Sequence, residues 1–172
     1  MFNLTFKKVL SLFWVVFPGL LGALLVGVPD QALAITPQTY PVAVQPQDDP
    51  SMLDAKRLNA LGMIETGNND RAIGLAGEIS RYQLSPPVWR SYSHSQDYRN
   101  PGLAVQVARQ HWNFLAAYFK EKTGRAPNDF DMYVLWNTRY GYYARRGFSK
   151  RQLCAVVQER AQRFVNLVNR QG

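Results

Sequence analysis

The stretch GMIETGNNDRAIGLAGEISRYQLSP, residues 62–86, decides how the sequence around it is interpreted. Apolar residues keep a helical spacing up to Ile64, and no helix or strand period continues beyond that residue. Gly67 stands where a helix would end, and two more glycines and a closing proline follow it. We therefore predict a helix that ends near Gly67, with Glu65 in its last turn, and then a shaped loop of the kind that holds binding and catalytic groups.

Helical patterns lie on both sides of this loop. The helix before it has one apolar face, formed with Leu53, Leu58, Leu61 and Ile64. Start signals after it are Pro86-Pro87, Asn100-Pro101, Asn128 or Asp129, and the capping-box pattern Ser149-x-x-Gln152; stop signals are Gly124 and Gly141. We predict a mostly α-helical domain over residues 51–172, with room for a small hairpin within residues 73–84 and with Trp112 and Phe114 in the core.

The first 34 residues have the pattern of a secretory signal peptide. They contain a basic start, an apolar run, a proline and a small-x-small site, formed by Lys7 and Lys8, residues 9–28, Pro29 and Ala32-Leu33-Ala34. An uncleaved membrane anchor is the alternative, because about 20 apolar residues can span a bilayer. Residues 35–50 contain four prolines and are predicted to be an extended linker. With either a signal peptide or an anchor, the domain is expected outside the cytoplasm.

Charge and cysteine content narrow the classes of partner. A formal net charge of +8 favours polyanions, and export favours an anionic cell-wall polymer over nucleic acid. Cys154 is the only cysteine, so no intramolecular disulfide forms, and its apolar neighbours predict a buried, unreactive thiol. No His or Cys cluster with metal-ligand spacing is present, and no cofactor is expected. His111 lies on an apolar helix face, where a packed, hydrogen-bonded side chain is expected.

Two carboxylates of residues 62–86 can carry acid–base chemistry. Glu65, at the end of an apolar helix, can have its pKa raised by burial and so act as a general acid, although a solvated helix-end glutamate is the alternative. Glu78 lies thirteen residues further on. It can activate a water molecule, or it can form an ordinary ion pair with Arg71 or Arg81.

Three ordered motifs resemble those of lytic transglycosylases and goose-type lysozymes. IETGNNDRA is similar to their Glu-Ser-Gly stretch, GEISRYQLSP to their Gly-Leu-Met-Gln stretch, and VLWNTRYG to their Ala-Tyr-Asn-Ala-Gly stretch. The interval of eighteen residues from Glu65 to Gln83 also matches. The resemblance implies a helical, lysozyme-like domain that cleaves the β-1,4 bond between N-acetylmuramic acid and N-acetylglucosamine in peptidoglycan glycan strands.

The resemblance also implies roles for single residues. Glu65 would be the catalytic acid, Thr66 would replace the serine beside it, Gln83 would line the sugar groove, and Asn137 would be the motif asparagine. Trp136, predicted to contact the substrate, stands at the family's tyrosine, so a hydroxyl associated with orienting the intermediate is missing at that position. Glu78 replaces a small residue of the transglycosylases, and some goose-type lysozymes have an aspartate at the same offset.

The identity at position 78 leaves two mechanisms open. In a lytic transglycosylase the C6 hydroxyl of muramic acid attacks and a 1,6-anhydro sugar forms, whereas in an inverting hydrolase Glu78 activates water. Tyr82 and Tyr140 are predicted to line the groove by stacking on sugar rings. The protein is expected to act as a monomer. The sequence is also compatible with a non-catalytic glycan-binding domain, an exported nucleic-acid-binding protein or an enzyme acting on chitin oligomers.

Overall fold

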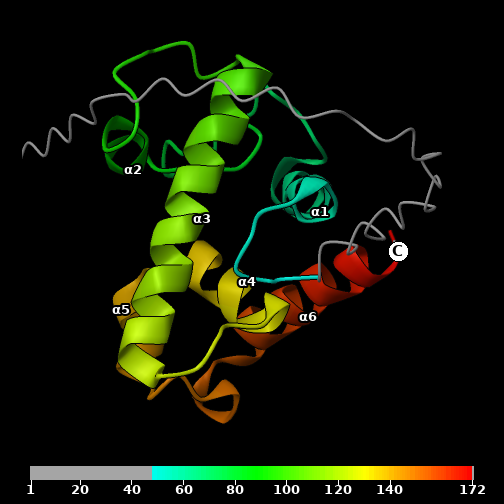
Figure 1. Cartoon of the computed structure of the whole chain (residues 1–172). Coiled ribbons are helices and arrows are strands. Elements are labelled where there is room, and N and C mark those ends of the chain that lie inside the picture. The colour runs from blue at the N-terminus through cyan, green and yellow to red at the C-terminus, as the bar shows by residue number, and fades with distance from the viewer. Residues whose placement is uncertain (1–47, 172) are drawn as a thin grey trace, which may run out of the picture. The chain divides into compact units, whose positions relative to one another are not determined.

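The computed structural model describes residues 48–171 (Figure 1), so the predicted signal peptide and residues 35–47 of the linker lie outside the described residues. The described part of the chain is mostly α-helical, as predicted. The helices are α1 (Ala55–Thr66), α2 (Pro86–Arg90), α3 (Pro101–Thr123), α4 (Asp129–Asn137), α5 (Tyr140–Ala144), a short 3-10 helix (Lys150–Gln152) and α6 (Ala155–Asn169). In place of a hairpin, residues 73–84 form two isolated antiparallel bridges, Ile73 with Ile79 and Ile79 with Leu84.

The first helix ends where the sequence predicts. Gly67 takes a left-handed conformation with φ of 66°, and its N–H donates to the carbonyl of Met63. A residue without a Cβ adopts this conformation without strain, which is why the helix stops here and the loop begins. Asn100 and Asn128 cap α3 and α4 with their side chains, and Gly124 ends α3.

Two predicted boundaries near the C-terminus are wrong. The helix expected to continue towards Gly141 ends at Asn137, and a separate helix, α5, begins at Tyr140. Ser149 makes no side-chain cap; it precedes the short 3-10 helix instead, and Cys154 stands at the start of α6. Cys154 is exposed rather than buried, because its position before the first turn of α6 directs it away from the core.

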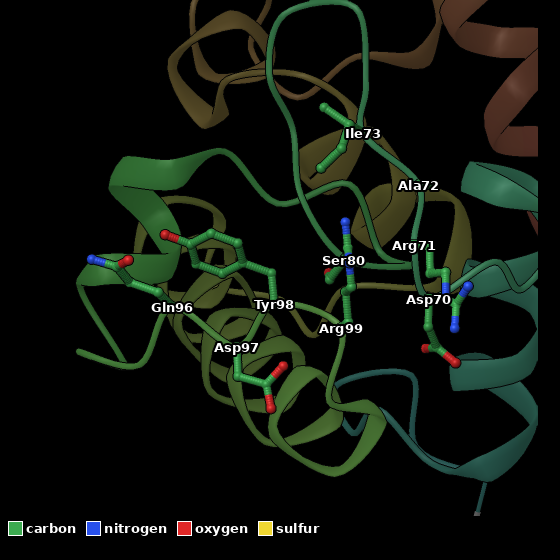
Figure 2. Close-up of a pocket in the computed structure, with 9 residues that line it drawn as sticks. All are labelled: Asp70, Arg71, Ala72, Ile73, Ser80, Gln96, Asp97, Tyr98 and Arg99. Atoms are coloured by element: carbon green, nitrogen blue, oxygen red, sulfur yellow. The ribbon is translucent and has the colours of Figure 1, made fainter.

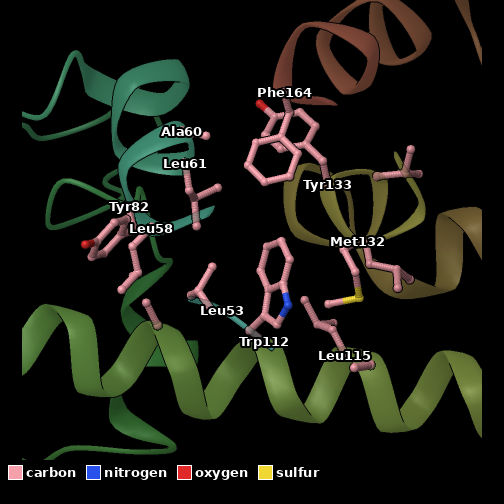
Figure 3. Close-up of a cluster of buried hydrophobic side chains, with 14 of the residues drawn as sticks. Leu53, Leu58, Ala60, Leu61, Tyr82, Trp112, Leu115, Met132, Tyr133 and Phe164 are labelled. Carbon is pink, nitrogen blue, oxygen red and sulfur yellow. The ribbon is translucent and has the colours of Figure 1, made fainter. Parts of the chain in front are cut away.

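The core lies where α1, α3, α4 and α6 meet (Figure 3). Its centre is an aromatic group: the Phe164 ring lies 5.1 Å from the Tyr133 ring and 6.0 Å from the Trp112 ring. Trp112 is fully buried, as predicted. Phe114 is 46% exposed, so its assignment to the core is wrong; it lies on the other face of α3. Helix α4 packs against α3, α5 and α6 and therefore sits at the centre of the domain.

A buried arginine fixes α1 against α4. The Arg57 side chain is 1% exposed, and its Nε donates to Asp129 at the start of α4 over 2.6 Å. Asp54 and Asp48 also accept from this guanidinium, at 2.7 Å and 2.5 Å. Asp48 thus contacts the domain, although the sequence assigned it to the linker. Because a buried charge must be fully paired, Arg57 holds the two helices in one arrangement.

No helix among residues 48–171 is long and apolar enough to cross a membrane.

Candidate active site

Glu65 is a nearly buried carboxylate that meets side chains from two other helices. It stands in the last turn of α1, and its side chain is 7% exposed. The Tyr133 hydroxyl, from α4, donates to Glu65 Oε1 over 2.7 Å. Arg160, from α6, reaches Glu65 Oε2 with Nη2 over 3.3 Å. Three helices that are far apart in the sequence therefore bring one acid, one hydroxyl and one guanidinium together.

Tyr133 joins the other two groups. Its hydroxyl oxygen accepts hydrogen bonds from Arg160 Nε and Nη2, at 3.2 Å and 3.1 Å, while its proton goes to Glu65. Burial and the adjacent Glu65 carboxylate raise the pKa of Tyr133, so the hydroxyl stays protonated and acts as a donor. Stacking on Phe164 fixes the ring.

The electrostatics of Glu65 are balanced between opposing effects. Burial raises its pKa above the ordinary value and is the largest influence. The Tyr133 hydrogen bond and the positive charge of Arg160 lower this pKa, and the negative charge of Glu78 raises it. The net shift is upward, so Glu65 holds its proton to higher pH than a solvated glutamate does. Of the two alternatives that the sequence left open for Glu65, the structure therefore has the buried carboxyl and not the solvated one.

The loop after α1 is fastened to the end of that helix. Thr66 Oγ1 donates to the carbonyl of Arg81 over 2.9 Å and accepts from the N–H of Asn69 over 3.1 Å. Arg81 pairs with Asp70 through Nε and Nη2, both at 2.6 Å. Thr66, predicted to stand beside the acid, thus has its hydroxyl occupied within the loop, and it positions the loop relative to Glu65.

Glu78 and Gln83 converge on one glycine. A Cβ added at Gly74 would collide with Glu78 Oε2 and with Gln83 Oε1, so both oxygens lie against the bare backbone of Gly74. Gln83 Nε2 donates to the carbonyl of Ser80 over 3.2 Å, and Ala76 N–H donates to Glu78 Oε2 over 3.1 Å. Within the described residues Glu78 forms no ion pair with Arg71 or Arg81, because Arg81 is bound to Asp70.

Two aromatic residues differ from their predicted roles. Tyr82 is 2% exposed and lies in the core cluster beside Leu58 (Figure 3), so the prediction that its ring lines a groove is wrong. The Ile79–Leu84 bridge and the turn between them direct residue 82 inward. Trp136 donates its indole N–H to the carbonyl of Tyr82 over 3.2 Å. That N–H therefore holds the loop and is not free for a sugar.

Tyr140 and Asn137 remain available to a ligand. Tyr140 is 47% exposed, and its ring lies 5.0 Å from the Tyr118 ring and 6.0 Å from that of the exposed Phe114. Asn137 is half-buried at the end of α4 and makes no side-chain hydrogen bond within residues 48–171. His111 packs 5.3 Å from the Trp136 ring, and burial lowers its pKa to about 4, so it is neutral at physiological pH.

The two partners of Glu65 were not identified as site residues from the sequence. Tyr133 and Arg160 both lie at positions that the sequence pattern assigns to apolar helix faces. At such a position Tyr133 resembles an ordinary core aromatic residue. The signal that was present is Arg160, a charged residue on the apolar face of α6 that also carries Phe164 and Val168. Tyr133 lies about one turn before Trp136 on α4, and its hydroxyl donates to Glu65.

A cavity of about 300 Å³ lies beside the loop that follows α1 (Figure 2), and a second of similar size lies near the start of α4. Glu65 lines neither of them. Comparison of the chain with protein-family models, with curated proteins and with solved structures found no match.

Proposed function

We propose that this protein cleaves the β-1,4 bond between N-acetylmuramic acid and N-acetylglucosamine in peptidoglycan, with Glu65 as general acid and base. The observation that carries the proposal is the nearly buried Glu65 carboxyl, with its raised pKa and its hydrogen bond from Tyr133. Its place in the last turn of α1, beside a polar loop, agrees with the motif resemblance of residues 64–86. The enzyme would act outside the cytoplasm, as a monomer and without a cofactor.

The surroundings of Glu65 suit a group that must both give and take a proton. Burial favours the protonated form, which donates to the glycosidic oxygen as the bond breaks. Tyr133 and Arg160 favour the carboxylate that this transfer leaves behind. Because burial raises the pKa of Glu65 while Tyr133 and Arg160 lower it, this one residue can be the acid in the first step and the base in the second.

Arg160 is the partner that can make room for a substrate. Its side chain is 41% exposed, whereas that of Glu65 is 7% exposed. The Arg160 guanidinium can turn into solvent when a substrate arrives, because water can replace the hydrogen bonds that it gives up. Tyr133, which is buried and stacked on Phe164, would stay in place.

The lytic transglycosylase reaction is the first candidate for the second step. The C6 hydroxyl of muramic acid attacks the anomeric carbon, its proton goes to the Glu65 carboxylate, and a 1,6-anhydro end forms. No water is consumed. This route needs only one catalytic carboxyl group, and among residues 48–171 Glu65 is the carboxyl group with a raised pKa.

An inverting hydrolase is the second candidate, and Glu78 favours it. The negative charge of Glu78 raises the pKa of Glu65, although it is the smallest of the influences on that pKa. Glu78 shares the space at Gly74 with Gln83 and forms no ion pair among residues 48–171. Such a carboxylate can activate a water molecule for attack from the opposite sugar face.

The test is to digest purified peptidoglycan with the full-length chain, beside an E65Q variant, in water enriched in ¹⁸O. Products are then read by mass spectrometry. Anhydro ends without ¹⁸O, absent with E65Q, identify a transglycosylase. Reducing ends that contain ¹⁸O identify a hydrolase and make E78Q the next variant.

Absence of products would refute the proposal if circular dichroism shows a folded protein and a known muramidase digests the same material. Binding to peptidoglycan without products, equal for wild type and E65Q, would instead establish a non-catalytic glycan-binding domain.

A further inference from the structure

The cavity of about 300 Å³ beside the loop after α1 is lined by none of the residues to which the proposed cleavage reaction assigns a role. It lies between residues 70–73, Ser80 and residues 96–99, and Figure 2 shows Ser80 beside Arg99 and the 70–73 segment. Its lining includes two arginines, Arg71 and Arg99, together with Tyr98 and Ile73. A cavity of this size holds part of a small ligand rather than a single ion.

The charges of the lining favour an anion. Neither Arg71 nor Arg99 has a carboxylate within ion-pair distance among residues 48–171, so both guanidinium groups keep their donors for a ligand. Asp70 is occupied by Arg81 through two hydrogen bonds of 2.6 Å. Asp97 is the one carboxylate of the lining that is left without an ion pair in the described residues, against two cations.

The wall of the cavity is held by its neighbours. Tyr98 packs edge-on against the fully buried Trp89, with ring centroids 5.2 Å apart. Trp89 Nε1 donates to the carbonyl of Ser95 over 2.8 Å, which fixes the start of this segment. Ile73, 65% exposed, adds an apolar rim. The site thus combines two cationic donors with an apolar surface.

The cavity and the region of Glu65 share one turn of the chain. Ser80, which lines the cavity, has a carbonyl that accepts from Gln83 Nε2 over 3.2 Å, and Gln83 lies with Glu78 at Gly74. The turn is tight, since Ser80 and Gln83 have φ of 63° and 52°. Such backbone strain in non-glycine residues persists where surrounding structure enforces it. Ser80 is therefore the residue through which the cavity wall and the turn that carries Gln83 are joined.

We propose that this cavity binds a carboxylate of the stem peptide, the short peptide attached to muramic acid. The inference rests on the proposed function and adds a substrate feature to it. The sugar rings are uncharged, whereas a stem peptide carries free carboxylates that can pair with guanidinium groups, and small apolar side chains. Arginine recognises carboxylates through paired hydrogen bonds, and Ile73 suits the methyl groups of alanine.

The first experiment compares two substrates with three variants. Glycan strands whose stem peptides keep their free carboxylates, and the same strands with these carboxylates amidated, are digested by wild type, R71Q, R99Q and the control R90Q, an exposed arginine on α2 that does not line the cavity. We expect wild type and R90Q to prefer the strands with free carboxylates by kcat/KM. In R71Q and R99Q that preference falls about tenfold, as expected for loss of a charge-assisted hydrogen bond worth about 1.4 kcal/mol. An unchanged preference would overturn the proposal.

The second experiment separates this inference from the proposed function. Free stem peptide is titrated into the full-length E65Q protein by isothermal calorimetry, with the same peptide amidated at its carboxylates as control. Binding of the acid and not the amide supports the cavity even if no strand is ever cleaved. Cleavage of strands without any peptide binding would overturn the cavity and leave the proposed function intact. Equal binding of acid and amide, or binding that R71Q and R99Q retain, would also overturn it.

Discussion

Asp131 and Glu65 are two buried carboxylates that each meet a tyrosine and an arginine, but they accept different numbers of hydrogen bonds. Asp131, with a side chain 3% exposed, accepts from the Tyr143 hydroxyl at 2.8 Å and from Arg125 Nη1 at 2.7 Å. Glu65 also meets a tyrosine hydroxyl and an arginine. Asp131, however, takes two further donors, Arg125 Nη2 at 3.2 Å and the Asn128 N–H at 3.2 Å.

The two carboxylates differ in how completely their oxygens are hydrogen-bonded. Four donors saturate Asp131 as an anion, and its place in the capping box of α4 makes it part of the architecture. Glu65 meets fewer donors, ends its helix beside a loop, and has a raised pKa because burial outweighs them. Burial with complete hydrogen bonding stabilises a fold, whereas burial with incomplete hydrogen bonding leaves a proton that can be exchanged.

The largest expected contrast is between E65Q and D131N. E65Q should lower the cleavage rate by at least about 100-fold, because an amide cannot donate the proton. D131N should cost about 2 kcal/mol of unfolding free energy, since its amide N–H₂ cannot accept from the donors that now meet Asp131. Rates come from muropeptide release, and stability comes from urea unfolding. A stable, inactive D131N would contradict the division of roles.

The pH dependence of E65Q stability follows from the raised pKa. The folded-state pKa of Glu65 lies above its unfolded value, so protonation contributes stability that is complete below the unfolded pKa and is lost as the pH rises through the folded pKa. The glutamine variant cannot ionise. We expect E65Q to gain stability relative to wild type between pH 4 and pH 8, and a constant difference in unfolding temperature over that range would contradict the raised pKa.

A substitution at Gly74 tests the loop side of the site. In G74A the new methyl group displaces the Glu78 carboxylate and the Gln83 amide, whose ends are flexible enough for the fold to survive. Activity should fall on the order of tenfold through lost positioning. The matched control is G102A in α3, where a Cβ meets its nearest atom at 3.4 Å. Equal activity of the two variants would exclude a role for Glu78 and Gln83.

The two tyrosines form a matched pair for a smaller effect. Y133F removes the hydrogen bond that lowers the pKa of Glu65, so that pKa rises further and the alkaline limit of activity moves to higher pH. Y143F removes the corresponding bond to Asp131 and should cost about 1 kcal/mol of stability without moving the pH profile. The measurement is activity from pH 4 to pH 9 with parallel unfolding curves. Identical profiles for the two variants would refute the assignment of Tyr133.

The smallest expected effect is that of R160Q. Loss of this positive charge should also raise the pKa of Glu65, and by less than in Y133F, because Arg160 is 41% exposed and solvent screens it. The shift should shrink in high salt. R125Q, which acts on Asp131, serves as the control. A salt-independent shift would mean that Arg160 acts through packing rather than charge.

Local signals in the sequence determined most of the secondary structure and the position of the acid. Gly67, Asn100 and Asn128 act on backbone groups within a few residues, so the bounds of α1, α3 and α4 at these positions can be read without knowledge of the rest of the chain. The same locality placed Glu65 in the last turn of α1, beside the loop. The prediction from local signals is wrong at Ser149, where the capping-box pattern is present but the chain forms a 3-10 turn.

Tertiary structure alone decided what surrounds the acid. Tyr133 lies 68 residues and Arg160 95 residues from Glu65, and no local pattern reports which face of α4 or α6 turns towards α1. The same packing put Tyr82 in the core and left Phe114 and Cys154 exposed. Caps and turns depend on short-range hydrogen bonds, whereas the pKa of Glu65 depends on burial and on charges that only the packed helices bring together.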